Sequence, residues 1–403
     1  MVMNEYTPSK KILEKYADVL INFALNGGRG IQKGEVVQIS VPDVAKPMAK
    51  ALYIAALKAG AHPLLRLTPT GLDKEFYKLA SDEQLTHFPK KFLKAKAELL
   101  DHVVSIIAEP DPNELKGIDS KKIMMSREAA YPYREWLFEK EHKKQFSWTL
   151  GLWATQAKAD IVGLSLKDYW EQIIKACFLD KKNPVEEWKK LNQMQQSIKH
   201  KLNDLDIEYV HVVGEDVDLV VKIGKNRAWK TGSGCNIPSF EHFTSPDWRG
   251  TNGWIKFNQP LYRYGNVIEG ISLEFKDGLI TKAKAKKGQK VLDDMLSTKN
   301  ANKLGEFSLT DNRFSRITHP MAETLFDENI GGPFGNTHVA VGMAYKDCYK
   351  GDASSVSEKQ WDKMGYNNSS VHTDIVSTKD RTVTATLQDG STKVIYKNGQ
   401  FTI

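Results

Sequence analysis

Cysteine is scarce in this chain of 403 residues: there are only three, Cys177, Cys235 and Cys348, and no two of them are spaced as CxxC. This sparse, odd set predicts neither a disulfide framework nor a zinc site built from thiolates. We expect three small packed thiols in a reducing compartment, and therefore an intracellular, cytoplasmic protein.

Long apolar runs and a strong charge of one sign are also missing. No apolar run approaches the ~20 residues that span a membrane, and the beginning, MVMNEYTPSKK, lacks the apolar core of a signal peptide. The formal net charge is +7, and lysines mix with acids in segments such as KKFLKAKAELL, which indicates solvated helix faces. Zinc-finger and RNA-binding motifs are absent too, so we expect neither a membrane partner nor a nucleic-acid partner.

Three common enzyme signatures are absent as well. There is no HExxH, which excludes the zincin arrangement, and no GxSxG, which argues against a serine nucleophile on a strand-to-helix turn. The segment GRGIQKG precedes a predicted strand, whereas a dinucleotide-binding loop follows one. We interpret it as a turn, and a cofactor-dependent α/β enzyme that uses a phosphate loop is therefore disfavoured.

The N-terminal part of the chain alternates between predicted helices and strands. Apolar residues at helical spacing, capping residues and β-rich runs mark each element. Helices are expected at 8–26, 43–58, 72–99 and 120–142, and strands at 35–41, 61–69, 102–110 and 146–155. Strands joined through helices form parallel sheets, so this pattern predicts an α/β domain with an open, twisted, largely parallel sheet.

The predicted secondary structure changes from mixed helix and strand to mainly strand after two more predicted helices within 166–204. Strands dominate from about residue 206, with short helices only near 289–304 and 320–326, and the end forms strand–turn–strand steps around DG and NG. We expect two domains, 1–205 and 206–403, of which the second is α+β and mainly β.

The last 170 residues contain a dispersed set of carboxylates and imidazoles. The candidates are Glu241 in the loop NIPSFEHFTSP, Glu306 in LGEFSL, Glu328 in LFDENIGG, His338 in NTHVAVGMAY, and His372 with Asp374 in SSVHTDIV. His372 and Asp374 are two residues apart, so in a strand both face the same side. His242 would point away from its neighbour in an extended segment, and Asp327 is either a rival ligand or a turn cap.

Oxygen ligands with two imidazoles suit a pair of divalent first-row cations. Two such cations about 3.5–4 Å apart can activate one water for hydrolysis. Each residue taken singly is more readily explained as structural or surface, and the wide separations along the chain exceed what any spacing rule can test. The residues alone therefore leave the metal site as a hypothesis.

An ordered series of motifs resembles one family, the metallo-aminopeptidases of the aminopeptidase T, aminopeptidase S and thermostable aminopeptidase II type. The matching segments are KGEVVQISV, ALKAGAHP, NIPSFEHFTSP, VIEGISLEF, KAKAKKGQ, LGEFSL, TLFDEN, HVAVGMAY and SSVHTDIV. The resemblance covers nearly the whole chain. It implies an exopeptidase with two divalent metal ions per chain (Zn, Co, Mn or Mg) in the C-terminal domain, acting on peptides with a free N-terminus.

The resemblance also implies roles for particular residues. The metal ligands would be Glu241, Glu306, Glu328, His338, His372 and Asp374. Glu306 would bridge the two metals, Tyr345 in VGMAY would stabilise the reacting oxyanion, and Glu241 would shuttle a proton. Members are commonly homodimers whose active sites face an enclosed space, so 1–205 would serve as scaffold and dimerisation domain.

The chain departs from the family's commoner form at one place. The histidine usually follows soon after DEN, whereas here GGPFGNT intervenes, so Glu328 and His338 are ten residues apart. The insertion either loops out or reshapes the substrate pocket. It also leaves a second function open: a catalytically altered member of the family that acts as a ligand-binding or assembly protein.

Overall fold

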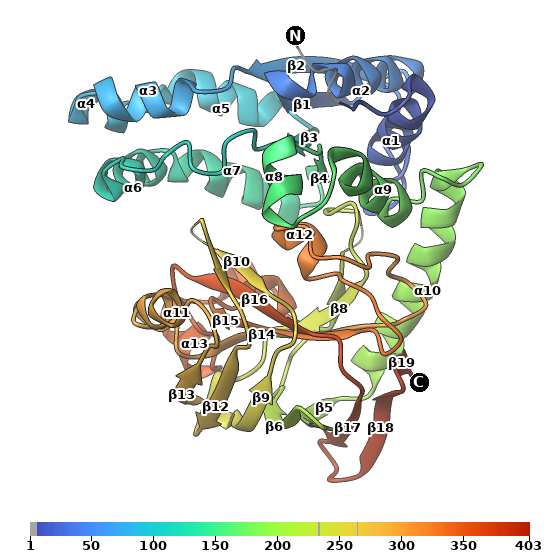
Figure 1. Ribbon diagram of the computed structural model, residues 1–403, viewed down its shortest axis with the longest axis vertical. Helices are drawn as coiled ribbons and strands as arrows, with labels where there is room; N and C mark the ends of the chain where they lie inside the picture. Colours follow the sequence, from blue (N-terminus) through green and yellow to red (C-terminus); the bar gives the residue numbers. More distant parts are fainter. Residues whose placement is uncertain (1–5, 233, 264) are drawn as a thin grey trace. The chain divides into compact units, whose positions relative to one another are not determined.

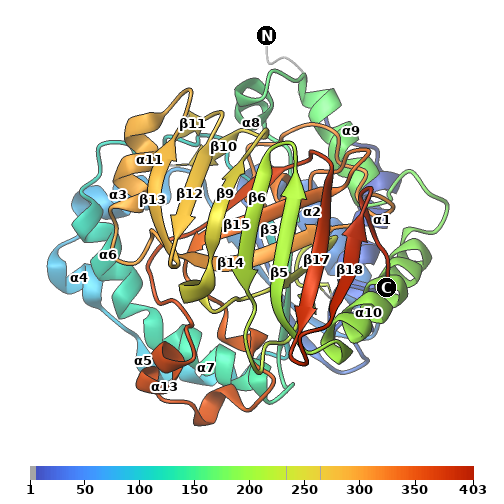
Figure 2. The ribbon, with the colours of Figure 1, turned by 90° about the horizontal axis from the view of Figure 1, so that it is seen from below.

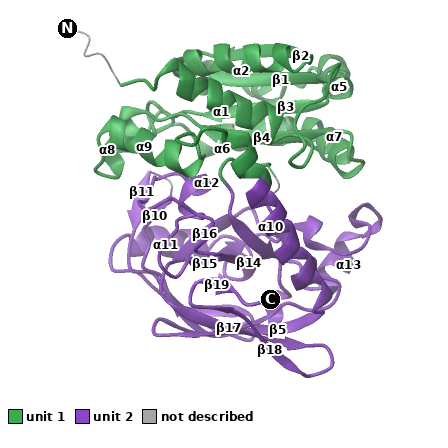
Figure 3. Cartoon of the chain, turned by 90° about the vertical axis from the view of Figure 1, so that its right-hand side faces the viewer, with its two compact units in different colours: residues 1–189, 233–238 green, residues 190–232, 239–403 purple. Residues whose placement is uncertain are grey.

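The computed structural model describes residues 6–232, 234–263 and 265–403, and it divides into two compact units (Figure 3). Unit 1 comprises residues 1–189 and 233–238, and unit 2 comprises residues 190–232 and 239–403. The division falls within the long helix α10 (Pro184–Asp204), upstream of the boundary at 205/206 that we expect from the sequence. In the described part of the chain, no helix is long and apolar enough to cross a membrane.

Unit 1 contains the predicted parallel sheet. Its strands are β1 (Val36–Pro42), β2 (His62–Thr68), β3 (His102–Ile107) and β4 (Ser147–Leu152), in the order β2-β1-β3-β4, and all neighbouring pairs are parallel. Parallel neighbours require crossover connections, and helices supply them (Figure 1). The helices of this unit before α10 are α1 (Lys10–Asn22), α2 (Lys46–Lys58), α3 (Leu72–Leu79), α4 (Asp82–Thr86), α5 (Lys90–Leu99), α6 (Ser120–Ala129), α7 (Tyr131–His142), α8 (Gln156–Ile161) and α9 (Leu166–Ala176).

Helix α1 forms where the sequence predicts it because Ser9 caps its first turn and one face is apolar. Tyr16 on that face is fully buried, and its hydroxyl accepts the amide of Leu152 in β4 at 2.8 Å. The single helix expected at 120–142 is instead two, α6 and α7. Pro132 lies in the first turn of α7, where its missing amide proton costs nothing, so the chain ends one helix and begins another there.

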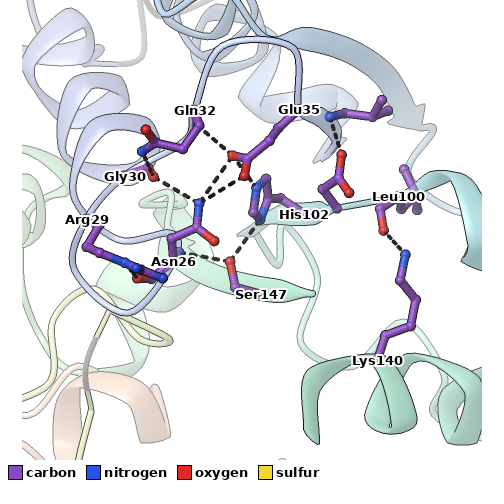
Figure 4. Close-up of polar contacts among 11 residues, drawn as sticks. Asn26, Arg29, Gly30, Gln32, Glu35, Leu100, His102, Lys140 and Ser147 are labelled. Carbon is purple, nitrogen blue, oxygen red and sulfur yellow. Dashed lines mark hydrogen bonds and ion pairs between the residues drawn. The ribbon is translucent and has the colours of Figure 1, made fainter. Parts of the chain in front are cut away.

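A polar network closes the N-terminal end of this sheet (Figure 4). His102, at the start of β3, is 2% exposed; its Nε2 lies 2.8 Å from Glu35 Oε2 and its Nδ1 lies 2.9 Å from Ser147 Oγ. Glu35 also accepts the amide of Gln32 at 2.6 Å and the side-chain amide of Asn26 at 3.2 Å. Although burial alone raises the pKa of Glu35, these hydrogen bonds from Gln32, His102 and Asn26 lower it overall.

The segment GRGIQKG forms turns within this network, as predicted. Gly30 has φ +77°, and a Cβ there would lie 2.3 Å from the carbonyl oxygen of Asn22. Only glycine fits this close approach, so the segment serves to connect α1 to β1.

Unit 2 contains an eight-stranded antiparallel sheet in the order β13-β12-β9-β6-β5-β17-β18-β19, most of which is seen face-on in Figure 2. Its strands are β5 (Ile207–Gly214), β6 (Val217–Lys222), β9 (Asn252–Lys256), β12 (Ser272–Lys276), β13 (Leu279–Lys284), β17 (Arg381–Leu387), β18 (Thr392–Lys397) and β19 (Gln400–Phe401). The predicted DG and NG turns connect β17 to β18 and β18 to β19. A separate hairpin pairs β10 (Leu261–Arg263) with β11 (Asn266–Ile268).

A second, five-stranded antiparallel sheet lies behind the first in Figure 2 and carries the candidate site. Its strands are β7 (Lys230–Thr231), β8 (Glu241–Thr244), β14 (Leu304–Thr310), β15 (Asn336–Gly342) and β16 (His372–Ser377), in the order β16-β15-β14-β8-β7. Every residue of β14 and β15 is buried. The fold class predicted from the sequence is thus confirmed: a parallel α/β sheet followed by a mainly antiparallel β domain.

Several elements of unit 2 differ in detail from the prediction. The helix expected near 289–304 ends early, as α11 (Gln289–Leu296), and the short helix α13 (Glu358–Lys363) is missed. Pro260 lies between β9 and β10, where proline cannot donate a hydrogen bond to a neighbouring strand. Gly270, with φ +64°, lies between β11 and β12. The apolar pattern of the sequence would join each of these pairs into one strand. Glu241, placed in a loop by its Pro- and Gly-rich surroundings, begins strand β8.

We expect that Glu35→Gln destabilises the parallel sheet by about 1 kcal/mol, because His102 is buried and loses its charged partner. The pKa of Glu35 is lowered on folding, so this contribution is present above pH ~4.5 and is lost as the pH falls through the folded pKa. Hydrogen exchange of β1 and β3 amides measures the effect within unit 1.

The matched control is Glu75→Gln in α3, which removes a half-exposed ion pair to Lys78 and changes exchange little. Equal protection of β1 and β3 in wild type and Glu35→Gln at pH 7 would contradict this account.

Candidate metal centre

The register of the five-stranded sheet places the candidate side chains on one face. Ala340 in β15 lies opposite Glu306 on one side and Asp374 on the other, and His338 lies opposite Ser308. Directly paired residues of an antiparallel sheet face the same side, as do residues two apart in one strand. Glu241, Glu306, His338, His372 and Asp374 therefore all project from the same face, although up to 133 residues separate them (374 − 241).

The first group of potential ligands is Glu241, Glu306 and His338. The Nε2 atom of His338 lies 3.2 Å from Glu241 Oε2 and 3.2 Å from Glu306 Oε1. One ligand atom from each of the three residues lies within 4.8 Å of the others. All three side chains are buried, and the His338 side chain is fully enclosed.

The second group is Glu306, His372 and Asp374. The Nε2 atom of His372 lies 3.7 Å from the other carboxylate oxygen of Glu306 and 3.6 Å from Asp374 Oδ1. Its Nδ1 donates to the carbonyl of Met343 at 2.8 Å, which leaves Nε2 directed at the carboxylates. Glu306 therefore belongs to both groups, with one oxygen facing each, and this is the geometry that a bridging carboxylate requires.

Glu328 is in neither group of three. It follows the short helix α12 (Thr324–Asp327) and is 9% exposed, close enough to the cluster for Glu241 and Asp374 to affect its charge. Burial, followed by those two carboxylates, raises the pKa of Glu328 well above its usual range. Asp327 is the turn cap rather than a rival, since its carboxylate accepts the amides of Met321 at 2.6 Å and Glu323 at 3.0 Å.

The inserted segment GGPFGNT is packed against the protein. The amide of Gly331 donates to Ile317, and Gly335 has φ +60° with its α-carbon so near Thr310 that a Cβ would lie 2.1 Å from that carbonyl. Asn336, its sixth residue, donates to the carbonyl of Glu328 at 2.9 Å and to that of Ile330 at 2.8 Å. The insertion thus ties the backbone of Glu328 to the strand that bears His338.

The structure also shows the surroundings of His242 and of the three cysteines. His242 lies on the opposite face of β8, where its Nε2 donates to the carbonyl of Gln195 at 3.0 Å, and burial lowers its pKa to about 4. It is a neutral core residue, as its position beside Glu241 predicts. Of the cysteines expected to be packed thiols, Cys177 and Cys348 are free and buried, whereas Cys235 is only half-buried.

The charges of the cluster are strongly coupled. Burial raises the pKa of Glu306 to about 7, assisted by Glu241 and Asp374. Burial alone would lower the pKa of His372, but Asp374 and Glu306 raise it to about 9. Burial would likewise raise the pKa of Asp374, but His372 and His338 lower it to about 2. Such perturbed groups, gathered on one face, are typical of a functional site.

These donors fit a pair of divalent cations. Glu241, Glu306, Glu328 and Asp374 carry four negative charges when ionised, and two divalent cations would balance them. Glu241, Glu306 and Asp374 form ion pairs with His338 and His372. Carboxylates with imidazoles are the ligand set that first-row divalent ions accept, so an ion near each group satisfies charges that would otherwise repel.

Tyr345 lies at the edge of this cluster, beyond the end of β15. Its ring centre is 4.6 Å from that of His372 and 6.1 Å from that of Phe243. Burial, followed by the carboxylates Glu306 and Asp374, raises the pKa of its phenol. The phenol is therefore protonated at neutral pH and can donate a hydrogen bond.

Sequence reasoning missed one charged neighbour of the site. Arg263 in β10 donates from Nη2 to the carbonyl of His372 at 3.0 Å, and its charge helps to lower the pKa of Asp374. No motif marks this residue, because it comes from the hairpin β10–β11, which lies outside the five-stranded sheet and packs against β16.

The comparisons with known proteins identify the class. Residues 9–401 match the family model described as thermophilic metalloprotease (M29). The chain belongs to this metalloprotease family, and its relatives define it further as a metallo-aminopeptidase, a hydrolase that uses divalent metal.

Its curated relatives are all named aminopeptidases. Aminopeptidase AmpS of Bacillus subtilis is 28% identical, with 96% of this chain and 98% of that protein covered. Aminopeptidase T of Thermus thermophilus is 27% identical, with 98% and 99% covered. The solved structure of wild-type AmpT from Thermus thermophilus is similar at 25% identity and a TM-score of 0.82, over 98% of this chain and all of that one. None of these findings supports the alternative of a non-catalytic binding or assembly protein.

Proposed function

We propose that this metallo-aminopeptidase removes the first residue of peptides with a free N-terminus at a dinuclear centre held by Glu241, Glu306, Glu328, His338, His372 and Asp374. The observation that carries the proposal is that Glu306 belongs to both groups of potential ligands. When bound by these residues, two divalent cations would lower the pKa of a bound water toward ~7 and polarise the scissile carbonyl. The ions are Zn, Co, Mn or Mg, because availability selects among them at a site rich in carboxylates.

The protein's own residues supply orientation and proton transfer. Tyr345, protonated because its pKa is raised, donates its phenolic proton in a hydrogen bond to the carbonyl oxygen of the substrate as negative charge develops there. Glu241 accepts the proton of the attacking water and passes it to the leaving amine. One of the two cations would supply a site for the free α-amino group of the substrate, which would fix cleavage at the first residue.

We expect hydrolysis only where that amino group is free. A metal-stripped and reconstituted enzyme should release the first amino acid from unblocked peptides, and N-acetylated versions of the same peptides should remain intact. A chelator should abolish the activity, and cobalt, zinc or manganese should restore it. Release from acetylated peptides contradicts an aminopeptidase, and activity that survives exhaustive chelation contradicts a metal-dependent one.

Single substitutions test the ligand set. His338→Ala and Asp374→Ala each remove a ligand from one group, so each should lose about one ion per chain and lower kcat/KM by more than ~100-fold. Glu306→Gln should lose both ions. Elemental analysis of the dialysed proteins gives the metal content.

His242→Gln is the matched control, since it alters an imidazole beside Glu241 that faces away from the cluster. It should keep both ions and its turnover. If His338→Ala retains full turnover and metal content, the assignment is wrong.

We further propose a homodimer formed through unit 1. Leu64, Leu65 and Leu67 of the edge strand β2 are 44%, 46% and 40% exposed, although parallel sheets are normally covered on both faces. Leu64 faces the opposite side of the strand from Leu65 and Leu67, and on its side Phe92 and Leu99 of α5 extend the apolar surface. An apolar surface of this kind commonly marks an interface. A second copy of the chain would cover it.

Light scattering should therefore give about twice the chain mass of 45.5 kDa. Leu65→Glu should yield a monomer, because a buried unpaired charge opposes association. Val213→Glu, on an equally exposed valine of β5, should leave the mass unchanged. A monomeric wild-type protein at micromolar concentration would refute the dimer.

A further inference from the structure

Tyr345 differs from the candidate metal ligands on the β-strands because it lies outside the sheet. The chain leaves β15 at Gly342, which has φ +102° and approaches Val371 so closely that a Cβ would lie 2.0 Å from its carbonyl oxygen. The following amides donate in turn to Val371 at 2.7 Å from Met343, to Asn367 at 2.9 Å from Ala344, and to Ser245 Oγ at 2.8 Å from Tyr345. Only the amide of Tyr345 is held by a side chain.

Ser245 connects that amide to the strand carrying Glu241. It follows β8 directly and is completely buried. Its hydroxyl accepts the Tyr345 amide, and its own carbonyl accepts Nε of Arg227 at 2.7 Å. One serine therefore sets the distance between the strand of Glu241 and the backbone of Tyr345.

Arg227, which donates to the carbonyl of Ser245, is itself held by several contacts. Its side chain is 4% exposed, its guanidinium lies 3.8 Å from the ring centre of Tyr366, and its Nη2 donates to the carbonyl of Met364 at 2.7 Å. The backbone on either side of Arg227 pairs with the segment after Tyr345, through Ala228 to Cys348 at 2.8 Å and Lys350 to Asn226 at 2.9 Å. These bonds hold the loop downstream of Tyr345, whereas Ser245 holds the amide of Tyr345 itself.

The orientation of the Tyr345 phenol depends on the position of this backbone. The ring centre of Tyr345 lies 4.6 Å from that of His372 and 6.1 Å from that of Phe243, yet 38% of the surface of the residue is exposed, so packing alone does not enclose it. Without the serine hydroxyl the amide would lose its hydrogen-bond acceptor. A shift of about 1 Å in a catalytic group can cost about 100-fold in rate.

We propose that Ser245 is a positioning residue for the reaction: its hydroxyl fixes the backbone of Tyr345 against β8 and thereby aligns the phenol with the carbonyl oxygen of the substrate. The proposal rests on the proposed role of Tyr345 and adds a residue that touches neither the ions nor the substrate. Arg227 is the second tie, acting through the carbonyl of Ser245.

Steady-state kinetics on an unblocked leucyl peptide test it. Ser245→Ala should lower kcat by about 10–100-fold, with KM and metal content unchanged, because only alignment in the transition state is lost. Ser245→Thr keeps the hydroxyl and should recover most of kcat. Arg227→Lys loses the planar donors and should show the same kcat-only signature with a smaller loss.

The decisive measurement is the double variant. Tyr345→Phe should lower kcat by itself, and adding Ser245→Ala should then cost little more, because the group being positioned is already absent. Ser377→Ala is the matched control: it removes another fully buried serine hydroxyl of unit 2, bonded to Asp216 and Arg381, and should leave kcat unchanged.

The outcomes separate the two proposals. If Tyr345→Phe keeps full kcat, the role of Tyr345 is wrong, whatever the serine does. If Tyr345→Phe is impaired but Ser245→Ala is not, or if Ser245→Ala costs as much in the Tyr345→Phe background as alone, the positioning role of Ser245 is overturned. Loss of metal or a raised KM in Ser245→Ala overturns it as well.

Discussion

The mutual repulsion of buried carboxylates is the constraint on which the C-terminal unit depends. Glu241 and Asp374 lie close enough to Glu306 and Glu328 to raise the pKa of both, and His338 and His372 pair with Glu241, Glu306 and Asp374. An arrangement of this kind costs stability unless cations balance it. It persists because Glu241, Glu306 and Asp374 lie on strands that ladders of backbone hydrogen bonds join into one sheet, so these residues cannot move apart without disrupting the sheet. The folded site thus has an unfavourable electrostatic free energy that bound divalent cations would lower. This is the physical basis of the affinity for metal that we propose for the site.

Much of the fold was accessible from the sequence, because its signals are local. Strands separated by capped helices predict a parallel sheet, and β1 to β4 form it; Pro132 explains the one helix that divides in two. The face shared by His372 and Asp374 follows from their spacing of two in a strand. The meeting of Glu241 with Glu306 and His338 could not be derived in this way. It depends on the registers of β8, β14 and β15, which pair residues far apart in the chain, and a slip of one residue would turn every ligand to the other face.

The errors in the sequence analysis have physical causes as well. Proline and glycine around Glu241 indicate a loop, yet the strand begins at that residue and pairs with Thr310, so tertiary pairing overrides local preference. The role of Arg263 is invisible in the sequence because a hairpin outside the ligand-bearing sheet delivers it. The GGPFGNT segment is a third case: Asn336 folds it back onto Glu328, so a departure from the commoner family spacing coexists with a Glu328 that remains beside the cluster.

The site divides its tasks between two kinds of backbone. Ligands must stay fixed relative to one another, and adjacent strands do this with directly paired residues. The proposed role of Tyr345 requires a phenol that lies outside the sheet, so its segment has to leave β15, and Gly342 permits the turn. A residue on such a segment is not paired with neighbouring strands. The orientation of its side chain therefore depends on a few individual hydrogen bonds to its backbone. The completely buried hydroxyl of Ser245 accepts one of these hydrogen bonds, from the amide of Tyr345. The residue that follows the strand of Glu241 thus helps to position a side chain that lies outside the sheet.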